Sequence, residues 1–233
     1  MSCQEFPEDI YHHLSKLIER CRKPEALDAN ELLFQIEVRL GQKTEKAFVP
    51  GVSYNEFFRI KEHLKQDQQE EQMQTDDDKL TEIYDVKLGN NIRTSLHDKR
   101  ESAIQRIVRE KEDFITYKPN IRIEFRKVRM LDDYEALAPK SEAIYALADN
   151  EGQRRPRHLR RKLRQVFRCN ENVHIKLTIV QQGMGTRNLD NSNKMYEVEF
   201  TMNVNINYCD DAAVKEFLSC VFKYGYQMDL NFQ

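Results

Sequence analysis

Residues 34–41 read FQIEVRLG and residues 196–200 read YEVEF, and both stretches alternate polar with apolar residues. This alternation is typical of β-strands with one polar face, because successive side chains of a strand point to opposite sides. The polar positions are Gln35, Glu37 and Arg39 in the first stretch, and Glu197 and Glu199 in the second. Carboxylates that project side by side repel each other unless a positive group lies between them, and a divalent cation often does so. We therefore predict a metal ion held between two strands that are far apart in the sequence.

The 233-residue chain carries many charges of both signs with almost no net charge. It has 37 Lys and Arg against 39 Asp and Glu, a formal net charge of −2, and 39% hydrophobic residues. Such a chain is long enough for one large domain or two small ones, and we expect a single domain over 1–233. The balanced charge excludes a simple polyelectrolyte binder. It favours acidic and basic groups that meet, either on the surface or in an internal polar site.

Cysteine usage and hydropathy indicate the compartment. The five cysteines are odd in number and show no CxxC spacing, which argues against a disulfide framework or a zinc site and favours a reducing compartment. No apolar run approaches the roughly 20 residues of a membrane span, and the acidic first residues lack the apolar core of a secretory signal. We expect a soluble intracellular protein with no membrane partner. The cysteines are Cys3, Cys21, Cys169, Cys209 and Cys220.

Periodicity along the chain predicts a few helices around many strands. A helix is expected over 8–22 within an N-terminal helical segment 1–30, a second over 53–66 with Ser53 as N-cap, and a closing helix over 211–223. Strands are expected over 32–40, 81–87, 91–97, 102–112, 120–130, 159–168, 173–181 and 194–205. Residues 66–79 and 183–193 are expected to be a polar loop and a Gly/Asn-rich turn, and 131–156 a variable insertion.

The polar faces of these strands are unusually rich in charge. Arg122, Glu124 and Arg126 share one face of a strand whose other face carries Ile121, Ile123 and Phe125, and Lys162 and Arg164 repeat the pattern. About eight antiparallel strands with few helices favour a mainly β (α+β) fold, a closed antiparallel barrel with charged residues inside and helices packed outside. A flat sheet with one solvated face is the alternative. Such a lumen suits a metal–polyphosphate substrate.

The two Glu-bearing strands, with the Lys-x-Arg strand Lys162-Leu163-Arg164 before the last one, resemble the triphosphate tunnel metalloenzymes. Within that superfamily the chain is most similar to the metal-dependent RNA 5′-triphosphatases of fungi, protozoa and large DNA viruses. It resembles in particular the N-terminal domain of an mRNA capping enzyme of the mimivirus type. The resemblance covers about residues 30–205, and it implies a viral protein located in the host cytoplasm or the virion.

The resemblance also implies roles for individual residues. Glu37, Glu197 and Glu199 would bind Mg²⁺ or Mn²⁺, with Gln35 at a position where the family expects Glu. The implied catalytic residues are Glu124, which would position the attacking water, and Arg93, Lys162 and Arg164, which would contact phosphate. The implied substrate-binding residues are Arg39, Arg122, Arg126, Lys111, Arg109, Lys176 and Thr178. Lys176 also departs from the family, which often has an acid there.

Gln35 is the more serious departure, because a neutral amide oxygen brings no charge to offset dehydration of a hard dication. Either three carboxylates suffice, or the chain is a weakened form, natural or deliberately substituted. A simpler interpretation also exists for Lys162 and Arg164, since seven of the eleven residues from Arg154 to Arg164 are Lys or Arg and could form a solvated surface run. That run could equally attract an RNA backbone.

The implied activity is release of the γ-phosphate from triphosphate-ended RNA, the first step of mRNA capping, together with Mn-dependent hydrolysis of nucleoside triphosphates. The expected partners are 5′-triphosphate RNA, nucleoside triphosphates and a guanylyltransferase, fused or associated. Two alternatives remain open. One is another tunnel enzyme, such as a tripolyphosphatase, thiamine triphosphatase or adenylyl cyclase. The other is a non-catalytic module that binds triphosphate RNA or polyphosphate.

Overall fold

The computed structural model describes residues 8–21, 33–69, 74–75, 80–87, 92–97, 105–117, 121–131, 158–184, 188–204 and 211–225. Helices and strands follow one another in the order α1 (Glu8–Cys21), β1 (Leu33–Lys43), β2 (Phe48–Pro50), α2 (Tyr54–Gln69), β3 (Gln74–Thr75), β4 (Thr81–Lys87), β5 (Ile92–His97), β6 (Gln105–Tyr117), β7 (Ile121–Leu131), β8 (His158–Arg168), β9 (Val173–Met184), β10 (Met195–Val204) and α4 (Asp211–Gly225).

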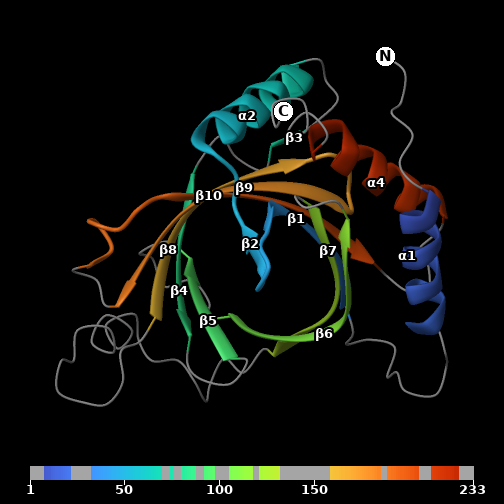
Figure 1. Cartoon of the computed structure of the whole chain (residues 1–233), viewed down its shortest axis with the longest axis horizontal. Coiled ribbons are helices and arrows are strands. Elements are labelled where there is room, and N and C mark those ends of the chain that lie inside the picture. The colour runs from blue at the N-terminus through green and yellow to red at the C-terminus, as the bar shows by residue number, and fades with distance from the viewer. Residues whose placement is uncertain are drawn as a thin grey trace.

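The strands form one antiparallel sheet in the order β10-β9-β8-β4-β5-β6-β7-β1-β2. Strand β1 is hydrogen-bonded to β7 on one side and to β10 on the other, so the two predicted Glu-bearing strands are neighbours. Strand β1 therefore has a neighbour on both sides, and the strands curve round a common centre in Figure 1.

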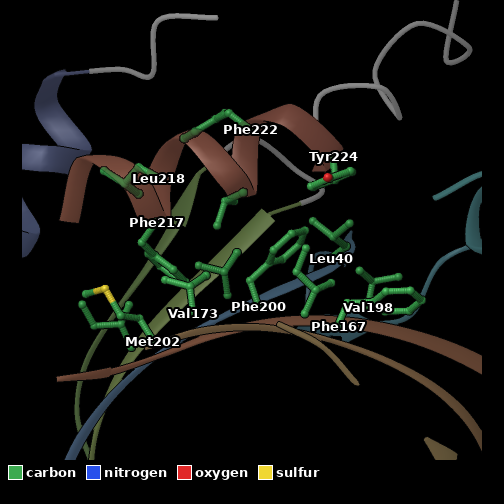
Figure 2. Packing of buried hydrophobic residues seen from close by; sticks show 14 of the residues in the cluster. Leu40, Phe167, Val173, Val198, Phe200, Met202, Phe217, Leu218, Phe222 and Tyr224 are labelled. Carbon is green, nitrogen blue, oxygen red and sulfur yellow. The ribbon is translucent and has the colours of Figure 1, made fainter. Parts of the chain in front are cut away.

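The helices cover the outer surface of this sheet, on the side of β1, β9 and β10 (Figure 1). Apolar residues at alternate positions of these strands, such as Ile36, Val38 and Phe200, are buried in one cluster with residues of α1, α2 and α4. Figure 2 shows the side chain of Phe217 in α4 directed onto the sheet. Because the apolar positions of a strand alternate with polar ones, this packing leaves the charged positions on the opposite face.

Local sequence signals account for the entry into α2. The Glu56 amide donates to Ser53 Oγ at 3.3 Å, and the Ser53 amide donates to Glu56 Oε2 at 2.7 Å. This reciprocal pair is a capping box, which satisfies backbone donors at the start of a helix. The expected N-cap at Ser53 is confirmed. The helix also ends later than predicted, at Gln69, so the expectation of a loop beginning at residue 66 is wrong.

Most of the predicted elements are confirmed, with errors at their ends. Strand β1 continues to Lys43 and β9 to Met184, so Gly183 lies in a strand and the expected turn begins later. The short strands β2 and β3 were not predicted, since two or three residues carry too little periodicity. Helix α4 runs to Gly225 rather than ending at 223. Residues 132–156 of the expected insertion, and residues 1–7 and 22–30, lie outside the described residues.

The mainly β, antiparallel architecture with helices packed outside is confirmed. Within the described part of the chain, no helix is both long and apolar enough to cross a membrane. The expectation of a single domain over 1–233 stays a prediction.

Candidate active site: a charged sheet face

The predicted carboxylates lie on adjacent strands of the polar face. In the β1–β10 register, Glu37 pairs with Thr201 and Arg39 pairs with Glu199. Residues paired across antiparallel strands share a face, so Glu37 and Glu199 are diagonal neighbours there. Glu199 also pairs with Lys176 of β9. Strand pairing thus brings together residues that are more than 150 positions apart in the sequence.

Arg39 joins the carboxylates of the two strands. Its Nη2 forms an ion pair with Glu37 Oε1, and its Nε lies 3.8 Å from Glu199 Oε2. Glu37 is fully buried, at 0% exposure, and Lys176 Nζ lies 3.4 Å from Glu199 Oε1. Burial acts to lower the pKa of Arg39, but Glu37, Glu199 and Glu197 outweigh that effect and the pKa is raised. Two carboxylates therefore lie within reach of a single cationic group.

Glu197, the third predicted carboxylate, has a different partner. Arg160 Nη2 of β8 donates to Glu197 Oε1 at 2.6 Å. Both side chains are about one-fifth exposed, so this charge-assisted bond is partly shielded from water. Arg160 thereby connects the carboxylates of β10 with the cations of β8.

The Lys-x-Arg pair of β8 is held by residues of both neighbouring strands. Lys162 Nζ donates to Asp85 Oδ2 of β4, and Lys162 and Asp85 are only 7% and 3% exposed. Arg164 Nε donates to Thr178 Oγ1 of β9 at 3.2 Å. Burial lowers the pKa of Lys162 to about 8, opposed by Asp85 and reinforced by Arg164 and Arg160. Lys162 is therefore a cation that can lose its proton near neutral pH.

Among the side chains that the structure describes, Gln35 contacts Asn203 and not the two networks above. Its Nε2 donates to Oδ1 of Asn203, its register partner on β10, at 3.1 Å. This bond uses the amide nitrogen of Gln35, whereas a metal ion would be bound by its amide oxygen. Whether Gln35 also binds a metal stays a prediction.

The remaining predicted residues lie on β5, β6 and β7 and are placed by strand register. Glu124 pairs with Glu37, Arg122 with Arg39, and Arg126 with Gln35. These three positions therefore share the sheet face of the carboxylates. On β6, Lys111 pairs with Arg126 and Arg109 pairs with Val128. On β5, Arg93 pairs with Lys87 of β4, and Lys87 is two positions after Asp85. The predicted site residues all fall on one face, and their individual roles remain predictions.

A metal ion was expected between these strands, and the carboxylates supply the hard oxygen donors that Mg²⁺ and Mn²⁺ prefer. In the described part of the chain, no three His, Cys, Asp or Glu residues are grouped so that they could hold a metal together. Glu37 and Glu199 do converge on Arg39, whereas Glu197 is bound to Arg160. The carboxylate oxygens are donors of the kind that a dication requires, and Glu37 and Glu199 already share one partner, Arg39.

Sequence reasoning missed two members of this site, Arg160 and Asp85. Arg160 is two positions before Lys162, so the strand period places it on the same face, but it was hidden within a run of basic residues. Asp85 lies in Ile83-Tyr84-Asp85-Val86, on the same face of the strand as Ile83, and an acidic residue beside an apolar position is a signal of a buried partner. The partner itself could be found only from the pairing of β4 with β8.

Comparisons with known proteins give structural neighbours only: no family model matches the chain, and no curated protein sequence matches it. The mimivirus capping enzyme triphosphatase aligns with 94% of this chain and 98% of its own, with a TM-score of 0.58 and 16% identity. The Pct1 RNA triphosphatase of S. pombe aligns with 97% of this chain and 93% of its own, with a TM-score of 0.62 and 14% identity.

These alignments span nearly the whole of each chain, and they place the protein in the fold class of the triphosphate tunnel RNA triphosphatases. The resemblance inferred from the motif strands is confirmed as a resemblance of fold. The chain is similar both to a viral and to a fungal representative of that fold.

Proposed function

We propose that this chain is a metal-dependent RNA 5′-triphosphatase, which removes the γ-phosphate of triphosphate-ended RNA in the first step of mRNA capping. One observation carries the proposal: carboxylates of β1 and β10 and cations of β8 and β9 share one polar sheet face, joined by the Arg39 and Arg160 ion pairs. A face that holds both signs of charge suits a substrate that is itself a metal–polyphosphate complex.

The cations of β8 would bind the phosphate oxygens. Arg164 is oriented by Thr178, and Lys162 by Asp85, so neither side chain has to be ordered at the moment of binding. The guanidinium of Arg164 presents planar donors that match phosphate oxygens, and the ammonium of Lys162 adds a point charge. A triphosphate bound beside Lys162 would favour the protonated lysine and raise its pKa above the value of the free protein.

The metal ion would be held by Glu37 and Glu199, with Glu197 as a third donor. When bound, a dication at these carboxylates would offset the charge of the terminal phosphate and polarise it towards attack. Arg39 occupies the space between Glu37 and Glu199 in the free protein. We expect it to turn from the carboxylates to the phosphate when the metal–triphosphate complex binds.

Glu124 is the proposed residue that orients the attacking water, and its pairing with Glu37 supports this role. An ionised carboxylate at this position would accept a hydrogen bond from the attacking water and so orient it. Arg93 of β5, which pairs with Lys87 of β4, would provide a further cation for the phosphate.

The proposal includes a closed barrel of about eight strands around a triphosphate tunnel, which the pairing of β1 with both β7 and β10 supports. It also includes Mn-dependent hydrolysis of nucleoside triphosphates and association with a guanylyltransferase. Support for such a partner comes from a neighbour described as the RNA triphosphatase domain of a trifunctional mimivirus mRNA capping enzyme. A viral origin, with the host cytoplasm or virion as location, stays a prediction.

A matched pair of variants on β8 tests the proposal. Arg160→Ala removes a cation from the polar face, where it contacts Glu197. Arg161→Ala removes the adjacent arginine, which contacts Glu82 and Asp190 on the outer face. With γ-labelled triphosphate RNA and Mg²⁺ or Mn²⁺, we expect phosphate release to fall at least about tenfold in the first variant and to stay within about twofold in the second.

The same assay separates the alternatives. A preference for tripolyphosphate or thiamine triphosphate over RNA would identify another tunnel enzyme. Binding of triphosphate RNA without metal-dependent phosphate release would identify a non-catalytic module. Equal losses of activity in the two arginine variants would contradict the assignment of the polar face as the active site.

A further inference from the structure

Two cysteines outside the polar face lie in contact. Cys169 directly follows β8, and Cys220 lies in α4, and their Sγ atoms are 3.1 Å apart although 51 positions separate them in the sequence. Both residues are free thiols and are partly buried. The contact is on the outer side of the sheet, where α4 packs, and none of the proposed steps of phosphate release uses it.

The backbone around each cysteine is held in place. The Cys169 amide donates to the Val173 carbonyl at 2.9 Å, and the Asn170 side chain accepts from the amides of Asn172 and Val173, which closes a tight turn between β8 and β9. Cys220 is flanked in α4 by the buried residues Phe217 and Val221. A disulfide bond is about 2.05 Å long, so the two sulfur atoms need to approach by only about 1 Å.

We propose that Cys169 and Cys220 are a reversible oxidative modification site, at which a disulfide forms between α4 and the turn that joins β8 to β9. A small-molecule disulfide such as oxidised glutathione is the oxidant. The Cys169 thiolate attacks one glutathione sulfur and releases a first reduced glutathione. Cys220 then loses its proton and attacks the Cys169 sulfur of the mixed disulfide, which releases the second. Two protein thiols are oxidised and one glutathione disulfide is reduced.

The order of the two steps follows from the surroundings of Cys220. A hydrogen bond with Cys169, together with burial, raises the pKa of the Cys220 thiol well above its ordinary value, opposed by Lys223. Cys220 therefore stays protonated while Cys169 reacts first, and it becomes the resolving thiol once the mixed disulfide is beside it.

The bond would stabilise the fold and leave the active site intact. It closes a long loop and so restricts the unfolded chain, and it fixes α4 against strands whose other face carries Lys162 and Arg164. We expect the melting temperature to rise by roughly 5–15 °C on oxidation. Phosphate release at moderate temperature should stay within about twofold.

The test uses the full chain with Cys3, Cys21 and Cys209 replaced by Ser, so that only the two cysteines of interest remain. After treatment with oxidised glutathione, we expect intact-mass spectrometry to show loss of the two thiol hydrogens without a bound glutathione. Peptide mapping should link residues 169 and 220, and a reductant should reverse both the link and the rise in melting temperature. Cys169→Ser and Cys220→Ser in the same background should form no link and show no rise.

Two outcomes would overturn the proposal. One is stable glutathionylation of either cysteine without a cross-link, and the other is an equal thermal shift in a single-cysteine variant. If a serine variant fails to fold, peptide mapping of the oxidised parent still decides whether the link forms. Mass spectrometry, peptide mapping and the melting temperature do not involve RNA. These three measurements therefore test the disulfide whether or not the protein is a phosphatase.

Discussion

Asp85→Asn is the perturbation that tests the buried charge pair most directly. Asp85 and Lys162 are 3% and 7% exposed, so the substitution would leave the lysine buried without the carboxylate that it contacts. Removing one partner of a buried ion pair typically costs about 3–5 kcal/mol of the free energy of unfolding. For a chain of this length, that loss corresponds to a fall of roughly 6–20 °C in melting temperature.

The same substitution should also weaken catalysis. Asp85 acts to raise the pKa of Lys162, which burial has already lowered to about 8. Without Asp85 the pKa falls further, so more of Lys162 is neutral at pH 7.5 and unable to hold a phosphate oxygen. We expect phosphate release to fall by at least about tenfold, and Lys162→Arg in the same background to recover part of it, because arginine stays charged.

The matched control is the double variant Asp85→Leu with Lys162→Met. Replacing both members of a buried pair with apolar residues is often neutral or stabilising, so its unfolding free energy should return to within about 1 kcal/mol of the parent. Its activity should not recover, because no cation remains at that position. Urea unfolding and γ-phosphate release measure the two effects separately. A single variant as stable as the parent, or a double variant that is active, would refute the reasoning.

Three further predictions address pH, metal binding and packing. The kcat/KM for triphosphate RNA, which reports the free protein, should fall by about tenfold per unit as the pH rises above about 8, where Lys162 loses its proton, and Lys162→Arg should remove this limb of the pH–rate profile. Gln35→Glu replaces the amide that donates to Asn203 with a carboxylate, and metal-dependent phosphate release should rise by about tenfold. An unchanged rate of release would contradict the interpretation of Gln35 as a weakened metal ligand. Phe217 of α4 is fully buried, and Phe217→Ala should lower the unfolding free energy by about 3–5 kcal/mol in a denaturant titration. A loss below about 1 kcal/mol would contradict the packing seen in Figure 2.

Much of the fold could be predicted because its signals are local. Alternation in FQIEVRLG and YEVEF identified β1 and β10, and a capping box fixed the start of α2. The ends of strands were less accurate, since hydrogen bonds to a neighbouring strand decide where a strand ends. Strand β1 continues past Gly41 because β2 pairs with it there, and a Cβ at Gly41 would collide with the Val49 carbonyl.

The candidate site was predictable in its residue types and less so in its contacts. Strand period alone placed Glu37, Glu197 and Glu199 on polar faces, but only the β1–β10 register showed that Arg39 joins two of them. Asp85 could not be connected with Lys162 from sequence, because the pair depends on β4 lying beside β8.

Release of γ-phosphate from labelled triphosphate RNA, with and without Mg²⁺ or Mn²⁺, tests the central claim most directly. The protein should release orthophosphate and leave diphosphate-ended RNA only when a divalent cation is present. Glu197→Gln should abolish most of this activity, while Glu82→Gln, on the outer face beside Arg161, should retain it. Release without a metal ion, or no release from the folded parent with either metal, would contradict the account.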